Sequence, residues 1–164
     1  MKLHIQDLTA EAFEPFGKVV QQPDIPQDAS GPGWKWWGGT AFMPGDQHAY
    51  GIGYLDLQPS VLEFDWAERH MHSAELLVPT GGDCLVYVGP PDHPDEPLRL
   101  PEIEKFKVFR VQQGQAVLLD KCVWHGAPLA IDRPLNVVVL LLDGTGETDV
   151  HLVRFSDAPV QIEN

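Results

Sequence analysis

The fold is decided by one stretch of the sequence, Glu68-Arg69-His70-Met71-His72-Ser73-Ala74-Glu75-Leu76-Leu77-Val78-Pro79. It brings two histidines and a carboxylate together and then continues as an apolar run of strand type. His70 and His72 are two residues apart, so on a strand their rings point to the same face. Glu75 lies further along and joins that face only if Ser73 and Ala74 form a turn or a bulge.

A second stretch later in the chain has the residues to complete a site, Cys122-Val123-Trp124-His125-Gly126-Ala127-Pro128. His70, His72, Glu75 and His125 together have the composition of a site for a divalent first-row metal, with imidazoles, one carboxylate and open coordination positions. The sequence therefore predicts these four residues as metal ligands. The alternative is a hydrogen-bonded pair of neutral histidines in a metal-free pocket, where they act as general acid and base.

Short strands, many of them separated by Gly or Pro, extend on both sides of these stretches. We expect strands at 51–57, 61–66, 83–88, 105–111, 115–119, 135–142 and 151–155. Thr9 is placed to cap a short helix that ends at Gly17. This pattern predicts an all-β sandwich or barrel that forms a single domain spanning residues 1–164, with a short N-terminal helix.

The composition narrows the classes of partner. The 164 residues carry a net charge of -13, which disfavours binding to nucleic acid or to anionic lipid. The negative net charge does not exclude a small anionic substrate, because a basic side chain or a metal ion in the site can outweigh the overall negative potential of the protein. The apolar run 135–142 is too short to cross a bilayer, and the chain has only two cysteines and no recognisable signal peptide. We therefore expect a cytoplasmic protein with reduced thiols.

A tryptophan-rich segment follows a loop rich in Pro, Asp, Gly and Ser. Trp34, Trp36 and Trp37 are separated only by Lys35. Such a cluster either lines a pocket or seals a dimer contact, or it plugs the barrel or covers an edge. The sequence does not decide between these roles.

The His-x-His pair, the following Glu and the later His resemble the cupin metal motif. Over nearly the whole chain the sequence also resembles the ureidoglycolate lyase family, also called ureidoglycolate hydrolase. The matching segments are Met1-Lys2-Leu3, Leu8 to Phe13, Phe16-Gly17, Glu68-Arg69-His70 with Val78-Pro79, Pro91-Asp92, Leu98-Arg99, Gly114-Gln115, Val123-Trp124-His125 with Pro128-Leu129, and Asp143 with Gly144 to Gly146. Residues 21–47 match poorly.

This resemblance implies a cupin-type β-barrel that forms a homodimer and cleaves (S)-ureidoglycolate to glyoxylate and urea in allantoin and purine degradation. It also implies a divalent metal, nickel in some descriptions of the family. His70 and His125 would serve as base and acid, with Glu75 in the same catalytic centre. A metal or Arg69 would hold the substrate carboxylate, and the metal is favoured because Arg69 points away from His70 on a regular strand.

The chain departs from the family pattern mainly in the pocket. Glu75 stands where the family usually has Gln, and His72 where it commonly has an apolar residue. Leu119-Asp120 replaces a Tyr-His pair, and Gly144 replaces an Arg. Two other functions therefore stay open: a metal-dependent cupin lyase, isomerase or dioxygenase acting on another small hydroxy or oxo acid, and a non-catalytic module that binds a sugar or a small acid.

Overall fold

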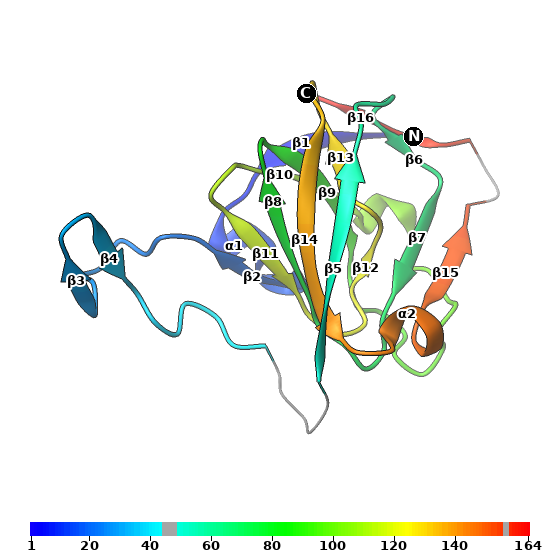
Figure 1. The fold of residues 1–164 in the computed structure, drawn as a ribbon. Coiled ribbons are helices and arrows are strands. Elements are labelled where there is room, and N and C mark those ends of the chain that lie inside the picture. Colours follow the sequence, from blue (N-terminus) through cyan, green and yellow to red (C-terminus); the bar gives the residue numbers. More distant parts are fainter. Residues whose placement is uncertain (44–48, 156–157) are drawn as a thin grey trace.

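Two β-sheets curl around a shared core in a computed structural model of the chain, which describes residues 1–43, 49–155 and 158–164 apart from the side chain of Trp34 (Figure 1). The larger sheet has the strand order β15-β7-β12-β9-β10-β1-β16-β6, with β13 beside β9. Its strands are β1 (Lys2–Asp7), β6 (Glu63–Phe64), β7 (Trp66–Arg69), β9 (Cys84–Gly89), β10 (Lys107–Val111), β12 (Trp124–His125), β13 (Leu129–Ala130), β15 (His151–Arg154) and β16 (Val160–Glu163).

The smaller sheet has the order β2-β11-β8-β14-β5. Its strands are β2 (Gly17–Val20), β5 (Tyr50–Leu57), β8 (Glu75–Thr80), β11 (Ala116–Leu119) and β14 (Leu135–Leu142). In the central strands β8 and β14, side chains such as Leu77 and Val139 point into the core and alternate with side chains that point outward. This period of two is what a strand with one face on a core requires.

The core between the sheets is apolar and includes aromatic side chains from the N-terminal helix. Leu77 of the smaller sheet and Val86 and Phe109 of the larger sheet belong to one buried cluster. The helix α1 (Ala10–Phe13) begins at Thr9, whose hydroxyl accepts a hydrogen bond from the backbone N–H of Ala12. Phe13 then packs edge-on against Phe109, with 5.2 Å between the ring centroids. The short 3-10 helices η1 (Glu14–Phe16) and η2 (Ile103–Lys105), and the helix α2 (Thr145–Thr148), complete the described elements.

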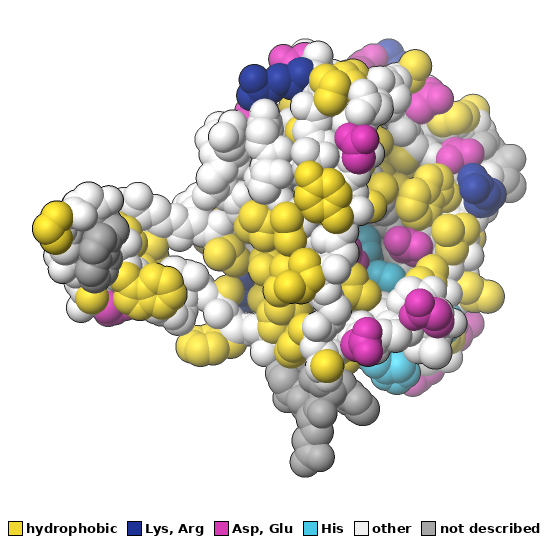
Figure 2. Space-filling view, in the orientation of Figure 1, with side chains coloured by type: hydrophobic (Ala, Val, Ile, Leu, Met, Phe, Trp, Pro, Cys, Tyr) yellow, Lys and Arg dark blue, Asp and Glu magenta, His cyan; other side chains and the backbone are white. Residues whose placement is uncertain are grey.

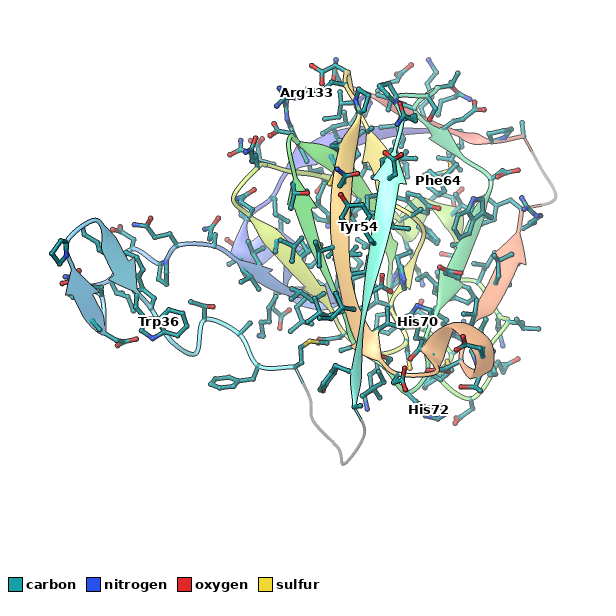
Figure 3. The ribbon with its side chains drawn as sticks, viewed as in Figure 1. Trp36, Tyr54, Phe64, His70, His72 and Arg133 are labelled. Carbon is teal, nitrogen blue, oxygen red and sulfur yellow. The ribbon has the colours of Figure 1, made fainter. Side chains whose placement is uncertain are left out.

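The tryptophan-rich segment forms a hairpin that stands away from the barrel (Figure 1). Its strands are β3 (Ala29–Gly31) and β4 (Trp34–Trp36). Trp36 is exposed and lies on this projecting hairpin, where Figure 3 labels it. It therefore does not plug the barrel. Trp36 and Trp37 instead line a pocket of about 410 Å³ together with outward-facing residues of β8 such as Leu76 and Val78.

The predicted all-β barrel with a short N-terminal helix is confirmed, and most predicted strands lie within one or two residues of their observed bounds. The prediction was incomplete at both ends of the chain. The strands β1 and β16 were not predicted, and they pair with each other in parallel, a partner that no local pattern reveals. Among the described residues, no helix is long and apolar enough to cross a membrane.

Candidate functional site

The stretch from Glu68 to Pro79 does not form one strand. β7 ends at Arg69 in the larger sheet, the chain bends at Met71 and His72, and β8 begins at Glu75 in the smaller sheet. A turn that lets Glu75 approach His70 is therefore present, but it lies at Met71 and His72 and not at Ser73 and Ala74 as predicted. As a result, the imidazole and the carboxylate reach the barrel interior from facing sheets.

One side chain from far away in the chain and one from the turn segment itself hold this turn. The carboxylate of Asp149 accepts hydrogen bonds from the backbone N–H groups of Met71 and His72, at 2.9 and 2.8 Å. The hydroxyl of Ser73 accepts a hydrogen bond from the backbone N–H of Leu142 at 2.9 Å. Sequence reasoning missed Asp149, because nothing in the local pattern relates it to a turn so far away in the chain.

Three of the four predicted ligands converge inside the barrel. The Glu75 Oε2 atom lies 3.1 Å from His70 Nε2 and 3.0 Å from His125 Nε2. The two imidazole centroids are 5.1 Å apart, and all three side chains are buried. Figure 3 places His70 inside the barrel beside β7, and Figure 2 shows histidine and acidic side chains at the base of a hollow there.

The far nitrogen of each ring is held by a backbone carbonyl. His70 Nδ1 lies 2.9 Å from the carbonyl oxygen of Asp149, and His125 Nδ1 lies 2.9 Å from that of Val123. Carbonyl oxygens only accept hydrogen bonds, so each Nδ1 carries a proton and each neutral ring has its lone pair on Nε2. Two lone pairs then face an ionised carboxylate, an arrangement that needs a cation, either protons or a metal ion.

The pKa values of His70 and Glu75 also indicate that the cluster favours a positive charge beside the carboxylate. Burial alone would lower the pKa of His70, but hydrogen bonds to Glu75 and to the Asp149 carbonyl, with the charges of Glu75 and Glu68, raise it above its ordinary value. Burial alone would raise the pKa of Glu75, but the charge of His125 and hydrogen bonds from both histidines lower it to about 2. The cluster therefore favours the ionised form of the Glu75 carboxyl group and the protonated form of His70.

Glu68 adds a second carboxylate to the site. One ligand atom from each of Glu68, His70 and His125 lies within 4.8 Å of the others. Glu68 is only partly buried and pairs with His125 across the β7–β12 ladder. From the sequence we would have taken it for a solvated charge, although its spacing of two from His70 was a signal that both residues share a strand face.

The structure does not bring His72 into the cluster. His72 is exposed, and Figure 3 shows it at the rim of the barrel below α2 while His70 lies inside. The same-face rule holds only while a strand continues, and β7 ends before His72. His72 lines a surface pocket of about 530 Å³ instead, with Lys121 and Asp149 among its neighbours. Arg69 is fully buried and, as expected from the parity, lies on the opposite side of β7.

The donor set fits a divalent metal ion. Two ligand atoms bound at roughly 2.1 Å and at right angles to each other are about 3.0 Å apart, whether the ligand is imidazole or carboxylate. The distances from Glu75 Oε2 to the two Nε2 atoms have this value. The Nδ1–H groups on carbonyls also match the usual support of metal-binding histidines. His70, Glu75 and His125 are therefore the residues that would hold such an ion, with Glu68 beside them.

Comparison with known proteins assigns the chain to a family. The family model described as ureidoglycolate lyase matches residues 1–163. A ureidoglycolate lyase of Rhodobacter capsulatus is 27% identical over 158 residues, covering 88% of this chain and 89% of the relative. One from Pseudomonas syringae pv. syringae is 27% identical over 151 residues, covering 88% of this chain and 85% of the relative.

Solved structures with a similar course of the chain include a dTDP sugar isomerase from Desulfovibrio desulfuricans, with a TM-score of 0.49 and 15% identity over 85% of each chain. An oxalate decarboxylase from Lactobacillus farciminis has a TM-score of 0.42 and 11% identity, covering 73% of this chain and 35% of that one. The family match is what identifies the protein, because it spans nearly the whole sequence. The chain belongs to the ureidoglycolate lyase family and is a lyase.

Proposed function

We propose that this protein cleaves ureidoglycolate to glyoxylate and urea at the cluster formed by His70, Glu75 and His125. The observation that carries this proposal is the convergence of two imidazole Nε2 atoms on one buried carboxylate oxygen, at 3.1 and 3.0 Å. The family assignment supports the reaction type, and the names of the relatives support the substrate. The four departures from the family pattern make the substrate the part that most needs a test.

The reaction asks for few chemical groups. Ureidoglycolate carries a hydroxyl group and a urea nitrogen on the same carbon. Its cleavage removes the hydroxyl proton, forms the carbonyl of glyoxylate, breaks the carbon–nitrogen bond and returns a proton to the nitrogen of urea. No water is consumed, so the site needs a proton carrier and a cation for the substrate carboxylate.

The residues of the cluster divide these tasks. A divalent ion, when bound by His70, Glu75 and His125, supplies a Lewis acid for the oxygen atoms of the substrate. In that state the Nε2 lone pairs are engaged, so neither histidine exchanges a proton there. Glu68, partly exposed and within 4.8 Å of both histidines, then accepts the hydroxyl proton and returns it to the departing nitrogen. The expected acid and base roles of His70 and His125 apply to the metal-free cluster alone.

The cation for the substrate carboxylate is the metal and not Arg69. The guanidinium group of Arg69 is buried on the far side of β7. His70, Glu75 and His125 would hold the ion, which would supply the positive charge that the substrate carboxylate and hydroxyl oxygen need. Nickel is the ion that the family resemblance favours, and elemental analysis of the purified protein identifies it.

The experiment that tests the function is product analysis with (S)-ureidoglycolate. We expect glyoxylate and urea in equal amounts, with no ammonia, because the reaction is an elimination. Glyoxylate with ammonia in place of urea would indicate hydrolysis of the urea group and a different mechanism. Release of neither product would refute the assigned substrate, and other small hydroxy acids would then be tested with the same protein.

We also propose that the protein acts as a homodimer through the outward face of the smaller sheet. The outer apolar face consists of Ile52, Tyr54, Leu76, Val78, Val138 and Leu140, which lie side by side in the ladders of β5, β14 and β8. Ile52 is 78% exposed and Tyr54 is 66% exposed. Figure 2 shows hydrophobic side chains gathered over these strands. Exposed apolar patches of this kind mark interaction surfaces.

A second copy of the chain fits this face better than another partner. Two copies with a net charge of -13 repel each other over most of their surfaces. The outer apolar face has no charged side chain, so it is where two copies can approach. The hairpin β3–β4 stands beside the same face and exposes Trp36, so an approaching copy contacts both. Sedimentation should give twice the mass of the chain at micromolar concentration, and a monomer would contradict the proposal.

A further inference from the structure

Arg69 carries a buried positive charge, and the proposed reaction gives this side chain no role. It lies between Glu68 and His70 on β7, but its side chain points to the other side of the larger sheet and is fully buried. A buried guanidinium group is costly unless its hydrogen-bonding capacity is satisfied. What satisfies it therefore indicates what the residue does.

The guanidinium group binds four carbonyl oxygens of a single loop. Its Nε donates to Pro97 at 2.9 Å and Nη1 donates to Asp92 at 2.7 Å. Its Nη2 donates to His93 at 3.0 Å and to Glu96 at 2.6 Å. His93 has a φ of 54°, an unusual value for a residue other than glycine. The backbone of the loop is therefore locally strained where it binds the guanidinium group of Arg69.

The same guanidinium group also contacts the second histidine strand. Its Cζ atom lies 4.5 Å from the ring centroid of Trp124, which is fully buried and precedes His125 on β12. β12 and β7 are neighbours, with His125 opposite Glu68. Arg69, the last residue of β7, directly precedes His70, and it contacts Trp124, which directly precedes His125 on β12.

We propose that Arg69 is a positioning residue that sets the relative placement of His70 and His125 by joining β7, the ring of Trp124 and the 92–97 loop. The inference rests on the proposed metal centre. It assigns Arg69 no contact with substrate. The guanidinium group donates hydrogen bonds to four carbonyl oxygens from three nitrogen atoms in one plane. Lysine has a single ammonium group and cannot replace this set of donors.

The test compares Arg69→Lys with Arg99→Lys as a matched control. Arg99 follows the same loop, but it is exposed and pairs with Glu96 at 2.7 Å. The readouts are Ni²⁺ affinity of the folded protein by calorimetry and the imidazole Nδ1–H resonances of the metal-free protein by NMR. We expect Arg69→Lys to weaken Ni²⁺ binding by about 10- to 100-fold and to shift both Nδ1–H resonances, with no change in Arg99→Lys.

Unchanged Ni²⁺ affinity and unchanged Nδ1–H resonances in a folded Arg69→Lys protein would overturn the inference, even if the loop became sensitive to protease. Should Arg69→Lys fail to fold, Trp124→Leu decides, because it removes the stacking contact and leaves the four carbonyl bonds. That variant should shift the His125 resonance more than that of His70. Should the wild-type protein bind no Ni²⁺, the metal proposal fails, and the resonances alone decide the role of Arg69.

Discussion

The inner and outer faces of the smaller sheet differ in a way that reverses the usual distribution of side chains. At one end of its inner face, Glu75 is buried as a carboxylate between two imidazoles. On its outer face, Ile52 and Tyr54 are large apolar residues exposed to water. Both arrangements are unfavourable for an isolated chain, since buried charges need partners and exposed apolar patches favour association. The contrast is what the two proposals explain, because a cation held at the inner face would compensate the buried carboxylate and a second copy of the chain would cover the outer face.

The largest effect should come from removing the charge of the inner face. Glu75→Gln keeps the shape but offers a neutral amide to two Nε2 atoms. We expect lyase activity and metal content to fall by at least about 100-fold. Glyoxylate assays and elemental analysis check this, with Glu147→Gln on the exposed side of α2 as the matched control. Full activity in Glu75→Gln would remove the inner face from the chemistry.

The second carboxylate should affect turnover more than metal content. Because Glu68 is placed beside the two histidines and carries the proton in the proposed reaction, Glu68→Gln should lower kcat by about 100-fold. Its metal content should stay within a few-fold of wild type, since His70, Glu75 and His125 remain. Loss of the metal together with the activity would instead make Glu68 a ligand.

The pH dependence of stability should report the same cluster in the metal-free protein. The pKa of Glu75 is lowered from 4.5 to about 2, so its contribution is present above the ordinary value and is lost as the pH falls toward 2. The pKa of His70 is raised above 6.5, so its contribution is present below that value and is lost as the pH rises through the raised one.

We therefore expect the free energy of unfolding to be highest between about pH 4.5 and 6.5 and to fall on either side of this range. Urea unfolding at a series of pH values measures this. The same series on Glu75→Gln should be much flatter over the acidic range, and an identical profile would place the titrating groups elsewhere.

On the outer face, a single charge should separate the two copies. Tyr54→Asp places a carboxylate where two apolar surfaces meet, and we expect the dimer to weaken by at least about 10-fold, with little change in thermal stability. Val61→Asp is the matched control, because Val61 is 68% exposed but lies outside the outer apolar face. Sedimentation velocity distinguishes the two variants. A Tyr54→Asp protein that stays dimeric would assign this face another role.

The smallest effect is expected for His72→Ala. The structure places this histidine outside the cluster, so metal content and activity should remain within about twofold of wild type. His70→Ala, by contrast, should lose the metal. Equal losses in both variants would mean that the turn at Met71 and His72 rearranges when the metal binds.

The sequence predicted the fold well because its strongest signals are local. The apolar run that forms β14 and the cap at Thr9 are properties of neighbouring residues, and both appear in the structure as expected. The two histidines and Glu75 were predicted from residue type. His72 was wrongly included because the end of β7 depends on Asp149, whose carboxylate holds the turn from far away in the chain.

Other features of the site depend on contacts that spacing does not encode. Glu68 was overlooked because its burial follows from pairing with β12. The proposed role of Arg69 depends on the 92–97 loop, whose backbone carbonyls bind its guanidinium group. The prolines between residues 90 and 101 indicate only that a loop is present, not which side chain it contacts. Residue type thus predicted which chemistry the site can perform, while long-range contacts determine which residues take part.

We propose above all that His70, Glu75 and His125 together hold one divalent cation. A crystal structure of the protein with data collected at the absorption edge of its metal tests this most directly. We expect one anomalous peak per chain, bonded to His70 Nε2, His125 Nε2 and a Glu75 oxygen. The claim would be contradicted by well-ordered side chains with no peak between them in metal-supplemented crystals, or by a peak bound elsewhere.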